Sequence, residues 1–111
     1  MKILLMGNPN VGKSVLFSRL TGVRVLASNY PGTTVGYTRG YMKLGNDIAE
    51  VIDVPGTYTL EATSEAEQIA SQMLSTGDLA INVVDATNLE RNLYLTLQLL
   101  ERKIPVIVAL N

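Results

Sequence analysis

The sequence contains no cysteine and no histidine in its 111 residues. Disulfide bonds, thiolate metal sites and acid–base catalysis by imidazole are therefore excluded within this chain. Without these ligands, a bound metal ion has to be held by oxygen atoms, which favours a hard cation over a transition metal. The absences leave Mg²⁺ as the type of ion to expect.

Long apolar runs and a strong net charge are also missing. No run approaches the roughly 18 apolar residues that a membrane-spanning helix needs, and the N-terminus lacks the layout of a signal peptide. Nine basic and ten acidic residues give a formal net charge of −1, which provides no long-range attraction to nucleic acid or to an anionic membrane. The sequence therefore predicts a soluble, cytoplasmic segment that binds no nucleic acid, and any bound anion has to be held by local geometry.

The sequence does contain short apolar runs that alternate with helical patterns. Strands are predicted over residues 2–6, 35–44, 48–54, 79–84 and 104–110, and helices over 13–20, from the capping box of Ser64 and Glu67 to Gly77, and over 89–100. Residues 23–34 have no sustained period and are predicted to be a loop. This order predicts one α/β domain over residues 1–111, with a mostly parallel sheet, one antiparallel hairpin and helices on both faces.

Four polar or glycine residues directly follow predicted strands: Gly7, Asp53, Asp85 and Asn111. Because the carboxyl ends of parallel strands meet at one edge of the sheet, and ligands bind at that edge, we expect these positions to surround a binding site.

The segment "GNPNVGKS" (7–14) matches the Gly-x-x-x-x-Gly-Lys-Ser phosphate loop between a predicted strand and a predicted helix. Gly7 and Gly12 let successive backbone N–H groups point at phosphate oxygens, Lys13 reaches the β- and γ-phosphates, and the Ser14 hydroxyl ligates Mg²⁺. The alternative is a chance glycine turn before a helix. The predicted nucleotide-binding residues here are Asn8, Pro9, Asn10, Val11, Gly12, Lys13, Ser14 and Val15.

A second segment, "DVPG" (53–56), adds the complementary chemistry. Asp53, at the end of a neighbouring strand, is predicted to hold Mg²⁺, and the Gly56 N–H is predicted to face a γ-phosphate. Between the two segments, Thr33 and Thr34 are both available to close over the γ-phosphate and to give Mg²⁺ another oxygen. The alternatives are a simple strand-ending turn and ordinary loop hydroxyls.

Four segments together resemble the G domain of the FeoB ferrous iron transporters: "GNPNVGKS", "NYPGTTVG", "DVPGTYTL" and "VVDATNLERNLYLTLQLLE". The resemblance covers essentially the whole chain. It implies a Ras-like P-loop GTPase domain that binds GTP or GDP with Mg²⁺. It also implies that a helical regulatory domain and a membrane-embedded iron pathway follow, with the chain at the cytoplasmic face of the inner membrane.

The resemblance also implies roles for single residues. Thr34, favoured over Thr33, matches the switch threonine that acts with Gly56 in catalysis, and Asn10 matches an asparagine that helps to ligate K⁺. The alternative role for Asn10 is to stabilise the loop itself. Thr57 stands where Ras-like proteins carry the glutamine that orients the attacking water, so slow intrinsic hydrolysis is expected.

The family pattern is not matched throughout. Tyr30 stands where the transporters commonly have Trp, and Gly36 where Glu is common. These departures leave open a stand-alone FeoB-like small GTPase or an Era-like ribosome-assembly GTPase, besides an ATPase and a pure binding module.

Asn111 corresponds to the first position of the Asn-Lys-x-Asp motif that reads guanine. The C-terminal part of the G domain is therefore expected to be missing, and guanine readout with it. The strand over 104–110 is then expected to be an apolar sheet edge through which the fragment self-associates.

Overall fold

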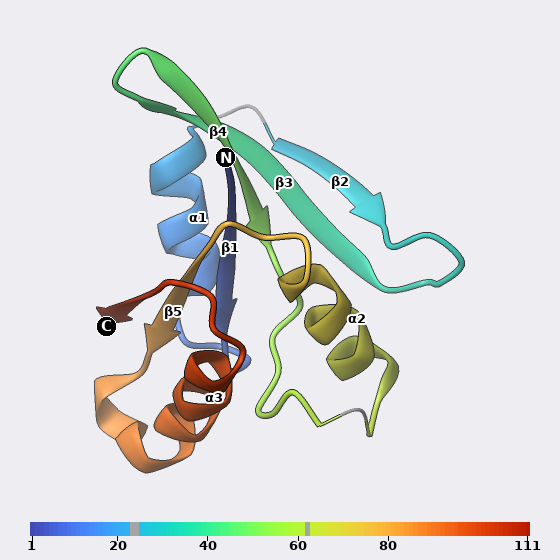
Figure 1. Ribbon diagram of the computed structural model, residues 1–111, viewed down its shortest axis with the longest axis vertical. Coiled ribbons are helices and arrows are strands. Elements are labelled where there is room, and N and C mark those ends of the chain that lie inside the picture. Colours follow the sequence, from blue (N-terminus) through green and yellow to red (C-terminus); the bar gives the residue numbers. More distant parts are fainter. Residues whose placement is uncertain (23–24, 62) are drawn as a thin grey trace.

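The computed structural model describes residues 1–22, 25–61 and 63–111, and these form a six-stranded sheet with helices on both faces (Figure 1). The strands run in the spatial order β2-β3-β4-β1-β5-β6. The central pairs β4–β1, β1–β5 and β5–β6 are parallel, whereas β3 is antiparallel to β4 and to β2. In chain order the elements are β1 Lys2–Gly7, α1 Lys13–Thr21, β2 Val25–Asn29, β3 Gly36–Leu44, β4 Asp47–Asp53, α2 Glu65–Leu74, β5 Leu79–Val84, the 3₁₀ turn η1 Ala86–Asn88, α3 Leu89–Glu101 and β6 Val106–Leu110. The predicted α/β class is confirmed.

The central strand β1 packs against helices on both of its faces. Leu4 and Met6 lie in a buried cluster with residues of α2 and α3, whereas Ile3 and Leu5 lie in a second cluster with Phe17 of α1. Because side chains alternate between the faces of a strand, one short apolar run supplies both layers of core. Figure 1 accordingly shows α1 to one side of β1 and α2 to the other.

The prediction of a loop over residues 23–34 is wrong for β2. Residues Val25–Asn29 form an edge strand that pairs with β3 from Val25↔Gly40 to Asn29↔Gly36; positions 23 and 24 lie outside the described residues. Val25 and Leu26 are both exposed, so the strand buries no side-chain face that would give it an alternating pattern. Its backbone pairing with β3 creates the strand, and no local sequence signal reports that pairing.

Helix α3 is docked on a face that its leucine pattern does not mark. Leu89, Leu93, Leu97 and Leu100, whose spacing predicts the helix, are 40–60% exposed, and the buried residues are Asn92, Leu95, Thr96 and Leu99. The Thr96 hydroxyl donates to Asn82 Oδ1 of β5, and Asn92 Oδ1 accepts from the Asp85 N–H at 3.1 Å. The helix thus docks partly through buried polar contacts.

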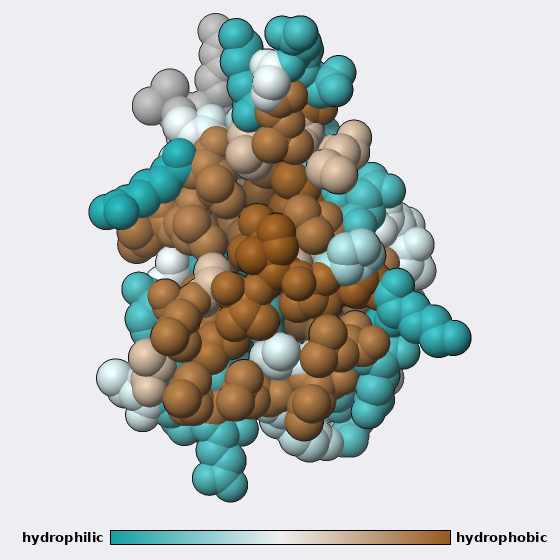
Figure 2. All heavy atoms as spheres, turned by 60° about the vertical axis from the view of Figure 1, so that its left-hand side comes forward, coloured by the Kyte–Doolittle hydropathy of each residue, from teal (hydrophilic) through white to brown (hydrophobic). Residues whose placement is uncertain are grey.

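An apolar surface extends over the side of the molecule where α3 and β6 lie (Figure 2). The exposed large apolar residues of these two elements include Leu93, Leu97, Leu100, Ile107, Val108 and Leu110. Strand β6 hydrogen-bonds to β5 and, within the described part of the chain, to no strand on its other side. The predicted edge is therefore present, although β6 begins at Val106 and not at residue 104.

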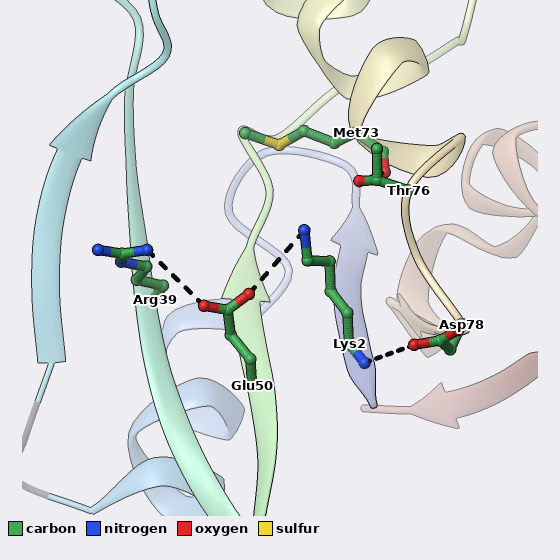
Figure 3. A network of polar contacts seen from close by, with 6 residues as sticks. All are labelled: Lys2, Arg39, Glu50, Met73, Thr76 and Asp78. Carbon is green, nitrogen blue, oxygen red and sulfur yellow. Dashed lines mark hydrogen bonds and ion pairs between the residues drawn. The ribbon is translucent and has the colours of Figure 1, made fainter.

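A polar network lies at the other end of β1 (Figure 3). Glu50 of β4 forms ion pairs with Arg39 Nη1 at 3.8 Å and with Lys2 Nζ at 4.0 Å, and the Lys2 N–H group donates to Asp78 at 2.7 Å. These partly exposed pairs contribute little stability individually. They tie β1, β3, β4 and the turn before β5 together, away from the Gly7 end of the strand. Across the described ranges, no helix is long and apolar enough to cross a membrane.

Candidate functional site

The four positions expected at the carboxyl edge of the sheet lie there. Gly7 ends β1 and Asp53 ends β4, while Asp85 and Asn111 directly follow β5 and β6. These four strands are neighbours and parallel, so their ends converge on one side of the sheet. The site can therefore be built from this edge.

The phosphate loop encloses a cavity of about 480 Å³ that is lined by Pro9, Asn10, Val11, Gly12, Lys13, Ser14, Val15 and Gly56. Helix α1 begins at Lys13, immediately after Gly12, whose φ of 87° lies in the left-handed region. Asn10 also has a positive φ, of 65°. This backbone directs the amino end of a helix toward the cavity, which is the usual arrangement for binding an anion.

Asn8 is the one predicted loop residue that does not line this cavity. Its side chain is 3% exposed, and neither its amide nitrogen nor its oxygen has a hydrogen-bond partner among the residues described. Asn8 therefore lies beneath the loop, where its side chain is turned into the protein.

The segment after β4 is held directly against the phosphate loop. The Thr57 N–H group donates to the Gly7 carbonyl at 3.0 Å, and a Cβ added at Gly56 would lie 3.0 Å from Pro9 Cα. A side chain at position 56 would therefore push the two segments apart. Thr57 itself is 4% exposed, and its hydroxyl has no partner in the described part of the chain.

Lys13 and Asp53 form an ion pair at the border of the cavity. The Lys13 ammonium donates to Asp53 Oδ1 and also to the Val54 carbonyl, the latter at 2.7 Å. Both side chains are largely buried, so each charge relies on the other for compensation. A ligand that carries both negative phosphate oxygens and a divalent cation offers each of the two side chains a new partner of opposite charge.

The two candidate threonines lie in the turn between β2 and β3. Thr33 closes this turn, because its N–H and its hydroxyl both donate to the Tyr30 carbonyl and its Oγ1 accepts from Val35 N at 3.1 Å. Thr34 is exposed. Neither threonine lines the cavity of the phosphate loop, so the structure does not bring them to the candidate site.

A second cavity, of about 490 Å³, adjoins Lys13 and Asp53 on the side of the β2–β3 hairpin. It is lined by Lys13, Ala27, Ser28, Asn29, Gly36, Tyr37, Thr38, Asp53, Val54 and Pro55. The contribution of β2 to this wall could not be predicted from the sequence, since the strand itself was not recognisable.

Asn111 is joined to the phosphate loop. Its side-chain amide donates to the Val11 carbonyl at 2.9 Å, and its backbone pairs with Val84 and Ala86. Together with Gly12, it borders a further cavity of about 330 Å³ between α1 and the end of β6. Asn111 therefore supports the loop through its side chain.

Asp85 has a local role in the turn that follows β5. Its carboxylate accepts hydrogen bonds from the Thr87 hydroxyl at 2.7 Å and the Thr87 N–H at 2.9 Å. Both bonds favour the ionised form and lower the pKa of Asp85 below its ordinary value. Asp85 thus opens the turn η1 and fixes the entry to α3.

The described residues contain no group of three or more acidic, histidine or cysteine side chains placed to hold a metal ion. The oxygen donors close to the cavity are the Ser14 hydroxyl, the Asp53 carboxylate and the Asn10 amide. A hard cation can be held by such a set only when a ligand, such as a phosphate group, completes it.

Comparison with known proteins agrees with this geometry. The sequence profile of the family described as "Ferrous iron transport protein B" matches residues 1–111. The Fe(2+) transporters FeoB of Shigella flexneri and of Escherichia coli K12 are each 53% identical over 113 residues, which cover 96% of this chain. The chain spans 15% of the length of these curated relatives.

Solved structures give the same relationship. The cytosolic domain of L. pneumophila FeoB is 49% identical, with a TM-score of 0.94 over 100% of this chain and 45% of that one. The G domain of T. maritima FeoB is 42% identical, with a TM-score of 0.94 over 99% of this chain and 70% of that one. A mutant of S. thermophilus NFeoB bound to GDP is 47% identical, with a TM-score of 0.93 over 100% of this chain and 44% of that one.

Proposed function

The chain belongs to the ferrous iron transport protein B family, as its N-terminal G domain, and from this premise we propose that it binds GTP and GDP and hydrolyses GTP slowly. The observation that carries the proposal is the single cavity lined by the whole loop from Pro9 to Val15 and by Gly56. Gly56 and the phosphate loop are separate in sequence and would contact successive phosphates of one nucleotide. The GDP-bound relative supports guanine as the base.

Mg²⁺ fits the residues present. Ser14 and Asp53 supply oxygen atoms near the loop, and Lys13 leaves Asp53 available when it moves to the phosphates. Mg²⁺ would neutralise charge on the β- and γ-phosphates. Asn10 lines the same cavity and offers an amide oxygen, which is a suitable ligand for K⁺.

Catalysis would depend on backbone groups and on a movable threonine. The Gly56 N–H would bind the γ-phosphate, and Thr34 would reach it only after the turn between β2 and β3 has moved. Thr57 is buried beneath the site, so its hydroxyl does not orient a water molecule in the cavity. Slow intrinsic hydrolysis follows from the lack of a side chain in that role.

We also propose that the domain works within a larger protein as a cytoplasmic regulator of ferrous iron transport. The chain matches 15% of each curated transporter, and a regulatory role would use the change of the segments around Thr34 and Gly56 between nucleotide states.

Nucleotide binding and K⁺ dependence can be tested together. We expect a fluorescent GDP analogue to bind in the presence of Mg²⁺ and to be displaced by GTP but not by ATP. In single-turnover assays we expect faster GTP hydrolysis in K⁺ than in Na⁺, and Asn10→Ala should abolish the difference while GDP binding is retained. Displacement by ATP as effective as by GTP would exclude guanine selectivity, and equal rates in both ions would remove the role of K⁺.

Self-association through β6 is a separate expectation. Ile107, Val108 and Leu110 are exposed along an edge strand, which favours pairing with a second copy. We expect the sedimentation coefficient to rise with protein concentration, and Val108→Lys to suppress this rise because edge lysines oppose strand pairing. A folded monomer at all concentrations would contradict the expectation.

A further inference from the structure

One face of α3 contacts the segment that follows Gly56. Arg91, Tyr94 and Gln98 are spaced by three and four residues, so they lie on the same side of the helix. All three contact residues 58–61. We call Arg91, Tyr94 and Gln98 the α3 clamp.

Gln98 makes the central contacts. Its Oε1 accepts from the Leu60 N–H at 2.7 Å and from the Thr59 hydroxyl at 3.2 Å, and its Nε2 donates to Thr59 Oγ1 at 2.9 Å. One side chain therefore holds both the backbone and a side chain of the segment. Leu60 is itself buried in the core beside α2 and α3, so the backbone at this point is fixed from two directions.

The two outer members of the clamp hold the flanking residues. The Arg91 guanidinium lies 3.8 Å from the centroid of the Tyr58 ring, a cation–π contact. The Tyr94 hydroxyl donates to Glu61 Oε1 at 3.1 Å. This bond, with the negative charges of Glu61 and Glu101, raises the pKa of Tyr94. Each residue from 58 to 61 therefore has a contact to the same helix face or to the core.

The other end of this segment is attached to the phosphate loop. Thr57 N–H donates to the Gly7 carbonyl, and Gly56 packs against Pro9. Gly56 consequently lies between two anchors, the phosphate loop on one side and the α3 clamp on the other. In this position it lines the phosphate-loop cavity.

Helix α3 is itself tied to the sheet. Asn92 accepts from Asp85 N–H and donates to the Asn88 carbonyl at 2.8 Å, and Thr96 donates to Asn82 of β5. These residues are buried. The clamp is therefore mounted on a helix that is fixed by polar bonds near the carboxyl edge of β5.

We propose that Arg91, Tyr94 and Gln98 are positioning residues that hold Gly56 where its N–H meets the γ-phosphate. The proposal rests on the proposed function, since it assumes that the cavity binds a nucleoside triphosphate. Its specific content is that the clamp supports binding of the γ-phosphate and not of the remainder of the nucleotide. The same three contacts provide a route from that phosphate to α3, whose opposite side carries the exposed leucines.

The test is the ratio of affinities for a non-hydrolysable GTP analogue and for GDP. In Gln98→Leu the Leu60 N–H loses its acceptor, and we expect affinity for the analogue to fall about three- to tenfold, the effect of one or two hydrogen bonds. Affinity for GDP should stay within about twofold. Gln98→Glu retains the acceptor oxygen and should restore most of the ratio. The matched control is Gln72→Leu, an exposed position on α2 whose side chain makes no hydrogen bond among the described residues.

Tyr94→Phe provides a second variant, because it removes only the hydroxyl of a half-exposed side chain and leaves the helix core intact. We expect a smaller fall in the same ratio and faster amide hydrogen exchange in residues 57–61. Equal loss of affinity for both nucleotides, or an unchanged ratio in Gln98→Leu, would overturn the positioning role while leaving nucleotide binding established. Failure of the unaltered protein to bind either nucleotide would instead overturn the proposed function and, with it, the role of the clamp.

Discussion

Replacing Lys13 by alanine should lower the affinity for both GDP and GTP by about 100-fold or more. Hydrogen bonds to charged groups contribute about 1.5–3 kcal/mol each, and each 1.4 kcal/mol or so corresponds to a tenfold change in affinity. Lys13 lies at the border of the cavity with its ammonium group on Asp53 and the Val54 carbonyl. In the nucleotide complex these donors would face the β- and γ-phosphates. Equilibrium titration with a fluorescent nucleotide measures the loss.

The structure adds a second consequence for the same substitution. Without Lys13, the largely buried carboxylate of Asp53 loses its partner, and an unpaired buried charge destabilises the fold. We expect a lower unfolding temperature for nucleotide-free Lys13→Ala, with stability partly recovered in the double variant Lys13→Ala/Asp53→Asn. Nucleotide binding should remain lost in the double variant. Lys43→Ala, on the exposed part of β3, is the control for removal of a lysine, and nanomolar-to-micromolar binding unchanged in Lys13→Ala would refute the assigned site.

Replacing Gly12 by alanine should impair both nucleotide binding and stability. Gly12 has φ 87°, a conformation that costs an L-residue about 1–2 kcal/mol. A Cβ at this position would also collide with the Asn111 side-chain amide, which donates to the Val11 carbonyl. The loop would have to shift or that hydrogen bond would break. We expect the free energy of unfolding to fall by about 2–3 kcal/mol in total, and nucleotide affinity to fall at least about tenfold.

Gly45→Ala separates the two causes. Gly45 also has a positive φ, of 61°, but a Cβ there would have no atom within 4 Å. Chemical denaturation should therefore show only the backbone penalty, about 1 kcal/mol, with nucleotide affinity unchanged. Equal destabilisation by the two substitutions would mean that the contact between Gly12 and Asn111 does not matter.

The phosphate loop is the part of the site that could be predicted most directly from the sequence. Its geometry depends on residues that are adjacent in the chain: a strand that ends at Gly7, a glycine with positive φ at position 12 and a helix that begins at Lys13. The position of Asp53 followed from the same local logic, because the end of a buried parallel strand locates the next residue at the carboxyl edge. The roles of Thr34 and Asn10 remain predictions from the family resemblance.

Other features depend on contacts between distant segments. The strand β2 exists because its backbone pairs with β3, and its exposed side chains carry no pattern that reports this. The leucines of α3 predicted a helix correctly, but helical spacing does not specify which of two apolar faces is buried. That choice depends on the contacts of Asn92, Leu95, Thr96 and Leu99 with the sheet.

By itself, then, the sequence determined the fold class, the order of most elements and the chemistry of the phosphate loop, since these rest on hydrophobic period and on short motifs. Only the tertiary structure decided that Gly56 lines the loop cavity, that Lys13 pairs with Asp53 across forty residues, and that α3 holds residues 58–61. Each of these depends on how separate segments approach one another when the core packs, and local sequence carries no record of those distances.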